Sequence, residues 1–228
     1  RFGFTREVLR AGLGTLVPTK GTNFAFLSSG VAGAGTPKSL DVWATSTQNA
    51  EAMNGLACPV SGFTYDCASL SFTFVAPDDA QSLAFDFNFL STEYPEFVGS
   101  NFNDMFQVSE SSPTNDYANI VFDGSGDPIN VNNVFFVQPC GQLTGTGYEI
   151  YNQFDPSACD AGATGMLTTW SPVKAGETVT MTFRVWDESD AWLDSAVLID
   201  NFRFDAQPIE TPYTATPTPT PEAAPSPT

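Results

Sequence analysis

Bulky apolar residues alternate with polar residues in several short stretches of the chain. The stretch SLAFDFNFL, residues 82–90, carries Leu83, Phe85, Phe87 and Phe89 at every second position. Successive side chains of a β-strand point to opposite faces of a sheet, so this period predicts half-buried antiparallel strands. Three further strands are predicted in the same way: one with Leu70, Phe72 and Phe74, one with Val179, Met181, Phe183 and Val185, and the stretch AVLIDNFRF at residues 196–204.

Between about residues 20 and 206 these stretches are separated by Gly, Pro, Asn and Asp, and few segments show a helical period. The 228 residues suffice for one large all-β domain or two modest ones, and 20 phenylalanines can fill its core. We therefore predict an all-β fold, a two-sheet antiparallel β-sandwich or jelly roll over residues 20–206.

The first 19 residues are predicted to form an N-terminal arm or a short helix. Thr5 is a suitable N-cap for the segment REVLRAGL, and Val8, Leu9 and Leu13 would form its apolar side. Such a helix would dock on the sandwich or on a neighbouring molecule.

The last 22 residues, 207–228, alternate Thr or Ser with Pro. This composition favours an extended polyproline II stalk and cannot bury a core. An unmodified spacer and an O-glycosylated linker are both compatible with it; the candidate threonines are Thr214, Thr216, Thr218 and Thr220.

The charge of the chain is strongly negative. Eight Lys and Arg stand against 26 Asp and Glu, which gives a formal net charge of −18, and there is no histidine. Such a surface repels phosphate, so nucleic acid is excluded as a partner, whereas metal cations fit. No Lys or Arg occurs between Lys38 and Lys174, so the acids in that interval need water or calcium to neutralise them.

Four cysteines, Cys58, Cys67, Cys140 and Cys159, show no C-x-x-C spacing and have no histidine to complete a zinc site. Two disulfides are therefore predicted. Of the three connectivities we favour the local pairs Cys58–Cys67 and Cys140–Cys159, which imply an oxidising compartment.

The chain starts at Arg1, which suggests that a leader was removed. No apolar run of about 18 residues is present to span a bilayer. We expect an extracellular or cell-surface protein.

Two acidic segments follow predicted strands: STEYPEFVGSNFND at residues 91–104 and WDESDAWLDSAVLIDN at residues 186–201. Calcium takes six to eight oxygen ligands, which carboxylates, amides and carbonyls in loops supply. The candidate ligands are Glu93, Asn103, Asp104, Asp187, Asp190 and Asp194. Without imidazole, zinc and copper are disfavoured, and magnesium tolerates crowded carboxylates less well. The plain alternative is that these acids are solvated.

Three other features have two interpretations each. DGSGDPIN, residues 123–130, resembles a calcium turn loosely, but a plain hairpin turn is favoured. Tyr94 and Phe97 could plug the core or form an exposed binding face, and the core is favoured. The tryptophans Trp43, Trp170 and Trp192 could stack on sugars but more often fill a core or an interface.

Several segments resemble a known bacterial family. SLAFDFNFLSTEYPEFVGSNFNDMFQV, then INVNNV, then AGETVTMTFRVWDESDAWLDSAVLIDNFRF are similar to the choice-of-anchor L domain, and TNFAFLSSGVAGAG resembles its early strand. The similarity spans roughly residues 20–206. The resemblance implies an extracellular protein with a β-sandwich and acidic loops, whose C-terminal surface anchor varies between members. It also places the six candidate ligands on family motif positions, so we expect the two loops to meet and clamp one calcium ion.

Three function classes are compared. An enzyme is the least supported, because without histidine no Ser-His-Asp or Cys-His site can form, although a carboxylate pair for glycoside hydrolysis remains open. A calcium-dependent carbohydrate-binding module is the second. We favour a structural or adhesive surface protein. The basic N-terminus, with Arg1, Arg6 and Arg10, and the acidic body suit head-to-tail self-association into a filament, for instance by strand addition to a neighbour's sheet edge.

Overall fold

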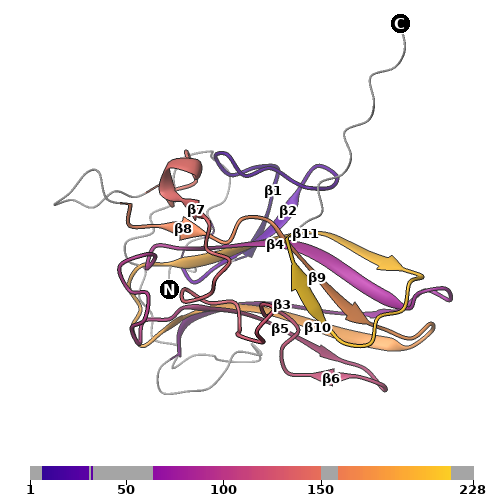
Figure 1. Ribbon diagram of the computed structural model, residues 1–228. Coiled ribbons are helices and arrows are strands. Elements are labelled where there is room, and N and C mark those ends of the chain that lie inside the picture. The colour runs from indigo at the N-terminus through magenta and orange to yellow at the C-terminus, as the bar shows by residue number, and fades with distance from the viewer. Residues whose placement is uncertain (1–6, 31, 33–63, 150–158, 217–228) are drawn as a thin grey trace, which may run out of the picture.

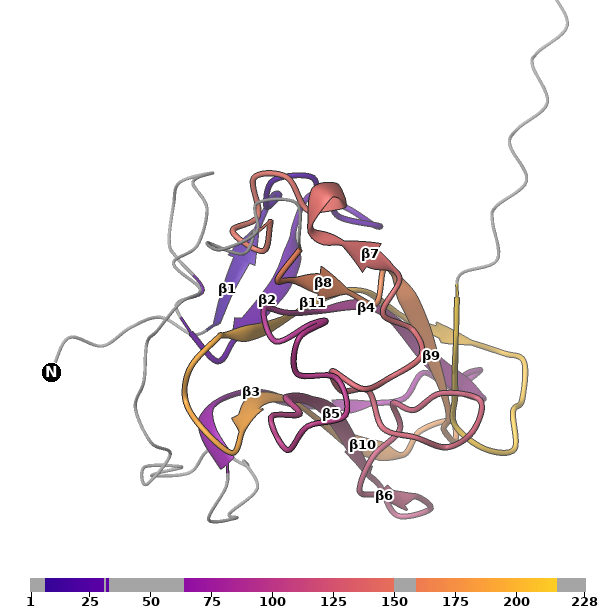
Figure 2. The same cartoon turned by 60° about the vertical axis from the view of Figure 1, so that its left-hand side comes forward.

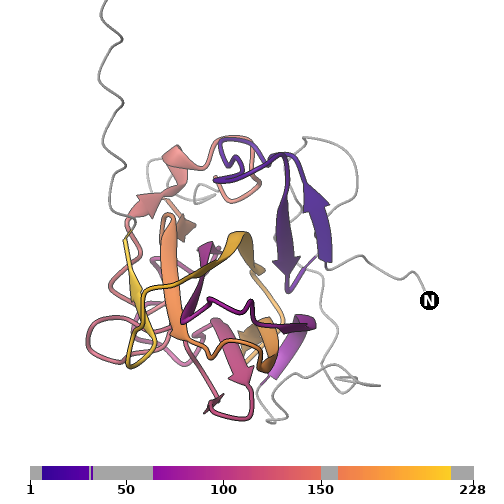
Figure 3. The ribbon, with the colours of Figure 1, turned by 90° about the vertical axis from the view of Figure 1, so that its right-hand side faces the viewer.

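The computed structural model describes residues 7–30, 32, 64–149 and 159–216, which form two antiparallel sheets packed face to face (Figures 1 and 3). The larger sheet has eight strands in the described residues, in the order β1–β2–β11–β4–β8–β7, with β9 beside β4 and β12 beside β9. The smaller sheet has the order β3–β10–β5–β6. The predicted all-β sandwich is confirmed.

The strands of the larger sheet are β1 (Glu7–Arg10), β2 (Phe24–Ser28), β4 (Ser82–Ser91), β7 (Gln138–Pro139), β8 (Gly162–Ala163), β9 (Leu167–Pro172), β11 (Ser195–Asp205) and β12 (Tyr213–Ala215). Those of the smaller sheet are β3 (Thr64–Val75), β5 (Met105–Ser111), β6 (Asp116–Tyr117) and β10 (Thr178–Glu188). One 3₁₀ helix, η2 (Cys140–Gln142), follows β7. No helix in the described ranges is long and apolar enough to cross a membrane.

The main core lies between the two sheets and is largely aromatic. Phe183 of β10 is fully buried, and its ring centroid lies 5.8 Å from that of Phe72 and 4.9 Å from that of Phe85. These residues come from the alternating positions of three predicted strands, which place their rings on the inner faces of both sheets. The period-two pattern therefore identified this core.

Strand β4 differs from the prediction of a half-buried strand, because all ten of its residues are buried. Its inner face carries Phe85 and Phe87, while Leu90 on its outer face joins a second apolar cluster. That cluster also contains Leu143 and Tyr148, so a segment outside the strands of the larger sheet covers β4 from the other side. The polar residues that alternate with the phenylalanines had predicted a solvent-exposed outer face, so the sequence pattern did not predict that this face is buried as well.

The predicted N-terminal helix is wrong for the residues that the structure describes. Residues Glu7–Arg10 form β1, which pairs with β2 in the register Val8↔Phe26. The strand lets Val8 pack on the second cluster and lets Arg10 lie over the Phe26 ring at 5.7 Å, while Leu9 is 74% exposed. Backbone pairing with β2 thus outweighs the weak helical pattern of this segment. Arg1, Thr5 and Arg6 lie outside the described residues.

The beginning of the predicted stalk is also part of the sandwich. Strand β12 (Tyr213–Ala215) pairs with β9, and the Thr214 hydroxyl lies 2.8 Å from that of Thr169. Thr214 is 8% exposed, so a sugar on it would displace the strand, which corrects its selection as a glycosylation site. Thr216 is exposed, whereas Thr218 and Thr220 lie outside the described residues.

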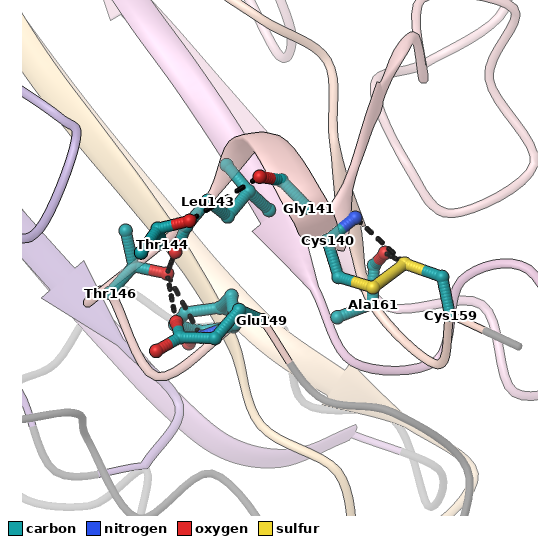
Figure 4. Close-up of a disulfide and its surroundings, with 9 residues drawn as sticks. Cys140, Gly141, Leu143, Thr144, Thr146, Glu149, Cys159 and Ala161 are labelled. Atoms are coloured by element: carbon teal, nitrogen blue, oxygen red, sulfur yellow. Dashed lines mark hydrogen bonds between the residues drawn. A yellow bond between two sulfur atoms is a disulfide. The ribbon is translucent and has the colours of Figure 1, made fainter. Parts of the chain in front are cut away.

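The predicted pair Cys140–Cys159 is confirmed as a disulfide (Figure 4). The backbone N–H of Cys140 donates to the Cys159 sulfur at 2.7 Å. In the adjacent loop the Glu149 carboxylate accepts the N–H groups of Gly145 and Gly147 at 2.9 and 2.8 Å. Cys67 is disulfide-bonded as well, but Cys58, its predicted partner, lies outside the described residues.

Replacing Phe183 tests the assignment of the aromatic core. Phe183→Ala leaves a cavity between the two sheets and is expected to lower the free energy of unfolding by about 3–5 kcal/mol, measured by urea denaturation. Leu9→Ala on the exposed face of β1 is the control, with an expected change within about 0.5 kcal/mol. Equal effects of the two substitutions would contradict the assignment.

Candidate metal centre

Three strands of each sheet meet at one end of the sandwich. In the larger sheet Ser195 at the start of β11 pairs with Ser91 at the end of β4, and Ala196 pairs with Ser28 at the end of β2. In the smaller sheet the end of β10 lies between the starts of β3 and β5. The loop after β4 and the chain from β10 to β11 therefore lie together, as Figure 2 shows. This brings together segments about 90 residues apart in the sequence.

Four of the six ligands predicted from the sequence are buried at this end. The exposed fraction is 2% for Glu93, 0% for Asp104, 0% for Asp187 and 1% for Asp194. Glu93 follows β4 and Asp194 directly precedes β11 of the larger sheet, while Asp187 lies on β10 and Asp104 directly precedes β5 of the smaller sheet. Both acidic segments of the sequence thus contribute buried carboxylates to this end of the sandwich.

Asp104 is fixed by hydrogen bonds from the last residue of β10 and the first residue of β11. Its Oδ2 accepts the Ser195 hydroxyl at 2.6 Å, and its Oδ1 accepts the backbone N–H of Glu188 at 3.0 Å. These bonds join the loop before β5 to the other acidic segment. Without these two hydrogen bonds the carboxylate oxygens of Asp104 would be buried without a donor.

Asp194 is positioned by the ends of β2 and β4. Its backbone carbonyl accepts the Thr92 hydroxyl at 3.0 Å, and the Ser29 hydroxyl accepts the N–H of Ser195 at 2.8 Å. The Asp194 carboxylate lies against Gly30, where a Cβ atom would come within 1.7 Å of Oδ2. The Ser-Ser-Gly sequence at 28–30 therefore provides the space for this carboxylate.

Three carboxylate oxygens in the site accept no hydrogen bond of normal geometry: Oε2 of Glu93 and both oxygens of Asp187. Ser29 lies near Asp187, but its hydroxyl donates to the carbonyl of Ser195 at 3.1 Å. No Lys or Arg of the described chain forms an ion pair with Glu93, Asp104 or Asp187. Buried charges normally require such partners, so this arrangement is costly for the protein alone.

The cost of burying these charges is seen in the raised pKa values of Glu93, Asp104 and Asp187. Burial, followed by the neighbouring Asp104 charge, raises the pKa of Glu93 to about 10. Burial raises the pKa of Asp104 to about 7, although the bonds from Ser195 and Glu188 oppose the shift. Burial and the charges of Asp104 and Asp194 raise the pKa of Asp187 well above its usual value. In the folded chain without a cation, these groups favour their protonated forms.

The structure places the other two predicted ligands at the edge of this cluster. Asp190 is half-buried, its charge contributes to the raised pKa of Glu93, and its Oδ1 accepts the N–H of Trp192 at 2.9 Å. The Asn103 side-chain oxygen instead accepts the N–H of Asn132 at 3.2 Å. In the described part of the chain, no three acidic or cysteine side chains already stand in a geometry that could hold one metal ion.

Two residues of the site were not selected from the sequence. Asp66 of β3 is 1% exposed, and its charge helps to raise the pKa of Asp187. Tyr148 is fully buried, and Asp194 and Asp187 are among the causes of its raised pKa, after burial. Asp66 has no acidic neighbours in the sequence, and Tyr148 lies outside both acidic loops. The sequence therefore contains no signal for either residue, and only the fold brings them to the carboxylate cluster.

The remaining candidates have structural roles. The Asp123 carboxylate accepts the N–H groups of Ser125 and Asp127 at 2.8 and 3.1 Å, which is a hairpin turn rather than an open calcium loop. The Tyr94 ring stacks on Phe136 at 4.8 Å and lies against Gly162, so it plugs the core. Phe97 is half-buried beside Phe102, at 5.4 Å between ring centroids.

The tryptophans differ in exposure. Trp170 is half-buried under the Arg203 guanidinium at 5.1 Å, and Trp186 is buried. Trp192, on the chain between Asp190 and Asp194, is 60% exposed. Trp43 lies outside the described residues.

Comparison with known proteins gives one match. The family model of the choice-of-anchor L domain matches residues 17–205, which include every strand that supplies the carboxylate cluster. No curated protein and no solved structure matches the chain.

Gly30 provides a test of the site's packing. Gly30→Ala places a methyl group on the Asp194 carboxylate and is expected to lower the free energy of unfolding by about 1–3 kcal/mol in urea denaturation. Gly124→Ala is the matched control, because a Cβ atom there meets nothing within 4 Å. If Gly30→Ala is as stable as this control, the Asp194 carboxylate does not lie where we place it.

The raised pKa values predict how the chelated protein responds to pH. The folded state holds protons on Asp104 and Glu93 up to about pH 7 and pH 10, whereas the unfolded chain releases them near pH 4. Stability should therefore fall as the pH rises from 5 to 8, because the folded state binds more protons. The urea midpoint in EDTA measures this, and Asp104→Asn should flatten the slope. A midpoint that rises with pH would contradict the burial of these acids.

Proposed function

The chain belongs to the choice-of-anchor L domain family, and from this membership and the buried carboxylates we propose an extracellular surface protein whose β-sandwich is closed at one end by calcium. The family indicates a surface-associated extracellular protein. The disulfide Cys140–Cys159 agrees with an oxidising compartment. The calcium role is the part that the following observations support.

The observation that carries the proposal is Asp187. Its side chain is fully buried near Asp104 and Asp194, and neither of its oxygens accepts a hydrogen bond of normal geometry. An unpaired buried carboxylate surrounded by other carboxylates is strongly destabilising unless it is protonated or binds a cation. A divalent cation would satisfy Asp187 and the free oxygen of Glu93 together.

The chemistry of the donors favours calcium over other metals. The cluster offers carboxylate and hydroxyl oxygens and no nitrogen or thiolate, which excludes a typical zinc or copper site. Calcium accepts irregular oxygen shells at about 2.3–2.6 Å, whereas magnesium requires near-octahedral geometry at about 2.1 Å. Because the carboxylates are not yet in ligand positions, binding would draw them together by side-chain rotation.

The burial of the site favours a structural role over a catalytic one. Glu93, Asp104 and Asp187 are at most 2% exposed, which leaves no opening for a substrate. An ion there would join the loop after β4, the end of β10 and the start of β11. It would stiffen this end of the sandwich, as suits a protein that acts in adhesion or as a subunit of an extracellular filament.

A second candidate function is calcium-dependent carbohydrate binding, for which Trp192 is the specific observation. Its indole is exposed on the segment between Asp190 and Asp194 and could stack on a sugar ring. A glycan array with wild-type protein and Trp192→Ala, each with calcium and with EDTA, tests this. Equal glycan signals from all four samples would exclude the assignment.

Thermal melting in calcium and in chelator tests the proposed function. Calcium at about 100 times its Kd should stabilise the protein by about 2.7 kcal/mol, raising Tm, whereas magnesium should have a smaller effect. Asp187→Asn should abolish the response to calcium while folding in chelator, because the amide removes a charge without changing the shape.

The control variant is Asp79→Asn, which changes an exposed acid outside the site. It should keep the full calcium response. An unchanged wild-type Tm between millimolar calcium and EDTA would contradict a calcium role.

A further inference from the structure

The smaller sheet has a long edge strand. β3 pairs with β10 on one side, and no strand of the described chain pairs with its other side (Figure 2). Its first half contains a β-bulge opposite the end of β10, and residues there have further partners. Its second half, residues 69–75, runs along β10 in regular register and away from the carboxylate cluster. Within the described chain this half is a straight, unpaired sheet edge.

The second half of β3 has backbone donors and acceptors directed at the unpaired side. The N–H of Ala76 donates to the carbonyl of Glu177 at 2.9 Å, so Ala76 faces β10. Successive residues of an antiparallel strand direct their N–H and C=O groups to its two sides alternately. Because the register is regular here, Ser71, Thr73 and Val75 direct theirs away from β10. A chain that lies along this side would find hydrogen-bonding groups at every second residue.

This edge lacks the features that normally prevent edge pairing. Edge strands of natural sheets are short or carry charges, prolines or bulges. Other edges of the described chain follow this rule: β1 carries Glu7 and Arg10, β7 contains Pro139, and β6 and β12 have two and three residues. Residues 69–75, SLSFTFV, contain no charged residue, proline or glycine. Such a composition is typical of segments that pair with another strand.

Aromatic side chains beside this edge are only partly covered. β2 pairs with β11 as far as Ile199, so no strand of the described chain lies beside the second half of β11 on that side. Four phenylalanine rings gather there at centroid distances of 5.3–6.0 Å: Phe72 and Phe74 of β3 and Phe202 and Phe204 of β11. All four are half-buried, unlike the fully buried rings at the centre of the core. Apolar surface is therefore left here for a partner to cover.

A second copy of the chain is the partner that this edge fits best. Each chain has a net charge of −18, so two copies repel each other except where both surfaces lack acids. No Asp or Glu occurs between Asp66 and Asp78, and the β10 residues that face outward beside this segment are Thr178, Thr180 and Thr182. A symmetric contact brings a surface patch against its own copy, so it requires a patch without acids.

We propose that two copies pair antiparallel along the second half of β3, centred on Thr73, and thereby join their smaller sheets into one continuous sheet. In this register Ser71 lies opposite the partner's Val75, so the residues that direct backbone groups outward meet each other. On the inner face Phe72 lies opposite the partner's Phe74, and these aromatic pairs cover the exposed rings. The inference goes beyond the proposed function and needs no calcium, because this half of β3 runs away from the carboxylate cluster.

The mass of the whole chain in solution tests the dimer. Analytical ultracentrifugation should give twice the 24.4 kDa mass of one chain, both in EDTA and in calcium. Thr73→Lys sets two like charges against each other and should raise the dissociation constant of the dimer about tenfold or more. Thr73 is exposed, so each copy should keep its fold by circular dichroism. Ser111→Lys is the matched control, because it adds the same charge at an exposed position of β5 in the same sheet, and it should keep the wild-type mass.

A cross-link locates the contact and also decides the case in which Thr73→Lys does not fold. Residues that form a hydrogen-bonded antiparallel pair have Cα atoms about 5.5 Å apart, within the range of about 4.4–6.8 Å that a disulfide spans. Thr73→Cys should therefore give a covalent dimer on a non-reducing gel after mild oxidation. Ser111→Cys, which lies away from the proposed contact, should remain a single chain.

The outcomes separate this inference from the calcium role. A wild type that is monomeric at its highest soluble concentration overturns the dimer. Cross-linking of Ser111→Cys as readily as Thr73→Cys overturns the assignment to β3, and a ladder of larger species in place of a dimer overturns the symmetric pairing. A calcium response by a monomer overturns this inference alone, whereas a dimer without a calcium response overturns only the calcium role.

Discussion

The burial of like charges at one end of the sandwich is the constraint on which the rest of this structure depends. Glu93, Asp104 and Asp187 lie out of contact with water and form no ion pair within the described chain. Electrostatic repulsion is strong in such a medium, and desolvation adds to it. The chain must therefore bind protons or a cation at this end. In an extracellular setting near neutral pH, a divalent cation is the partner that satisfies several carboxylates at once.

The architecture explains how two distant acidic segments reach one site. β4 and β11 are neighbours in the larger sheet, and β10 lies between β3 and β5 in the smaller one, so the ends of these strands converge. Gly30 leaves space for the Asp194 carboxylate, and the Ser195 hydroxyl donates a hydrogen bond to the Asp104 carboxylate from the other sheet. The second apolar cluster covers the outer face of β4 and carries Tyr148 to the site, beside the disulfide Cys140–Cys159. Rigid strands thus hold the acids in place, and an ion would connect them.

Much of the sandwich could be predicted because period-two alternation reports directly on which side chains face a core. The phenylalanines of β4 and the apolar residues of β10 both fall where the pattern placed them. The N-terminal segment was mistaken for a helix because a four-residue strand has too few positions to show its period, and only pairing with β2 fixes it. Two acidic loops could be recognised by composition, but Asp66 could not, since a β-bulge rather than a local motif directs it. Asn103 sits in the right loop, yet its amide oxygen is taken by the backbone of Asn132.

Anomalous scattering from crystals grown in calcium is the most direct measurement of the central claim. The account predicts difference peaks within about 2.3–2.6 Å of the Asp187 oxygens, with Asp104 and Glu93 turned toward the same ion. The claim would be contradicted if well-ordered crystals gave no peak at this position and Asp187 were instead a protonated acid that is hydrogen-bonded to a neighbouring carboxylate.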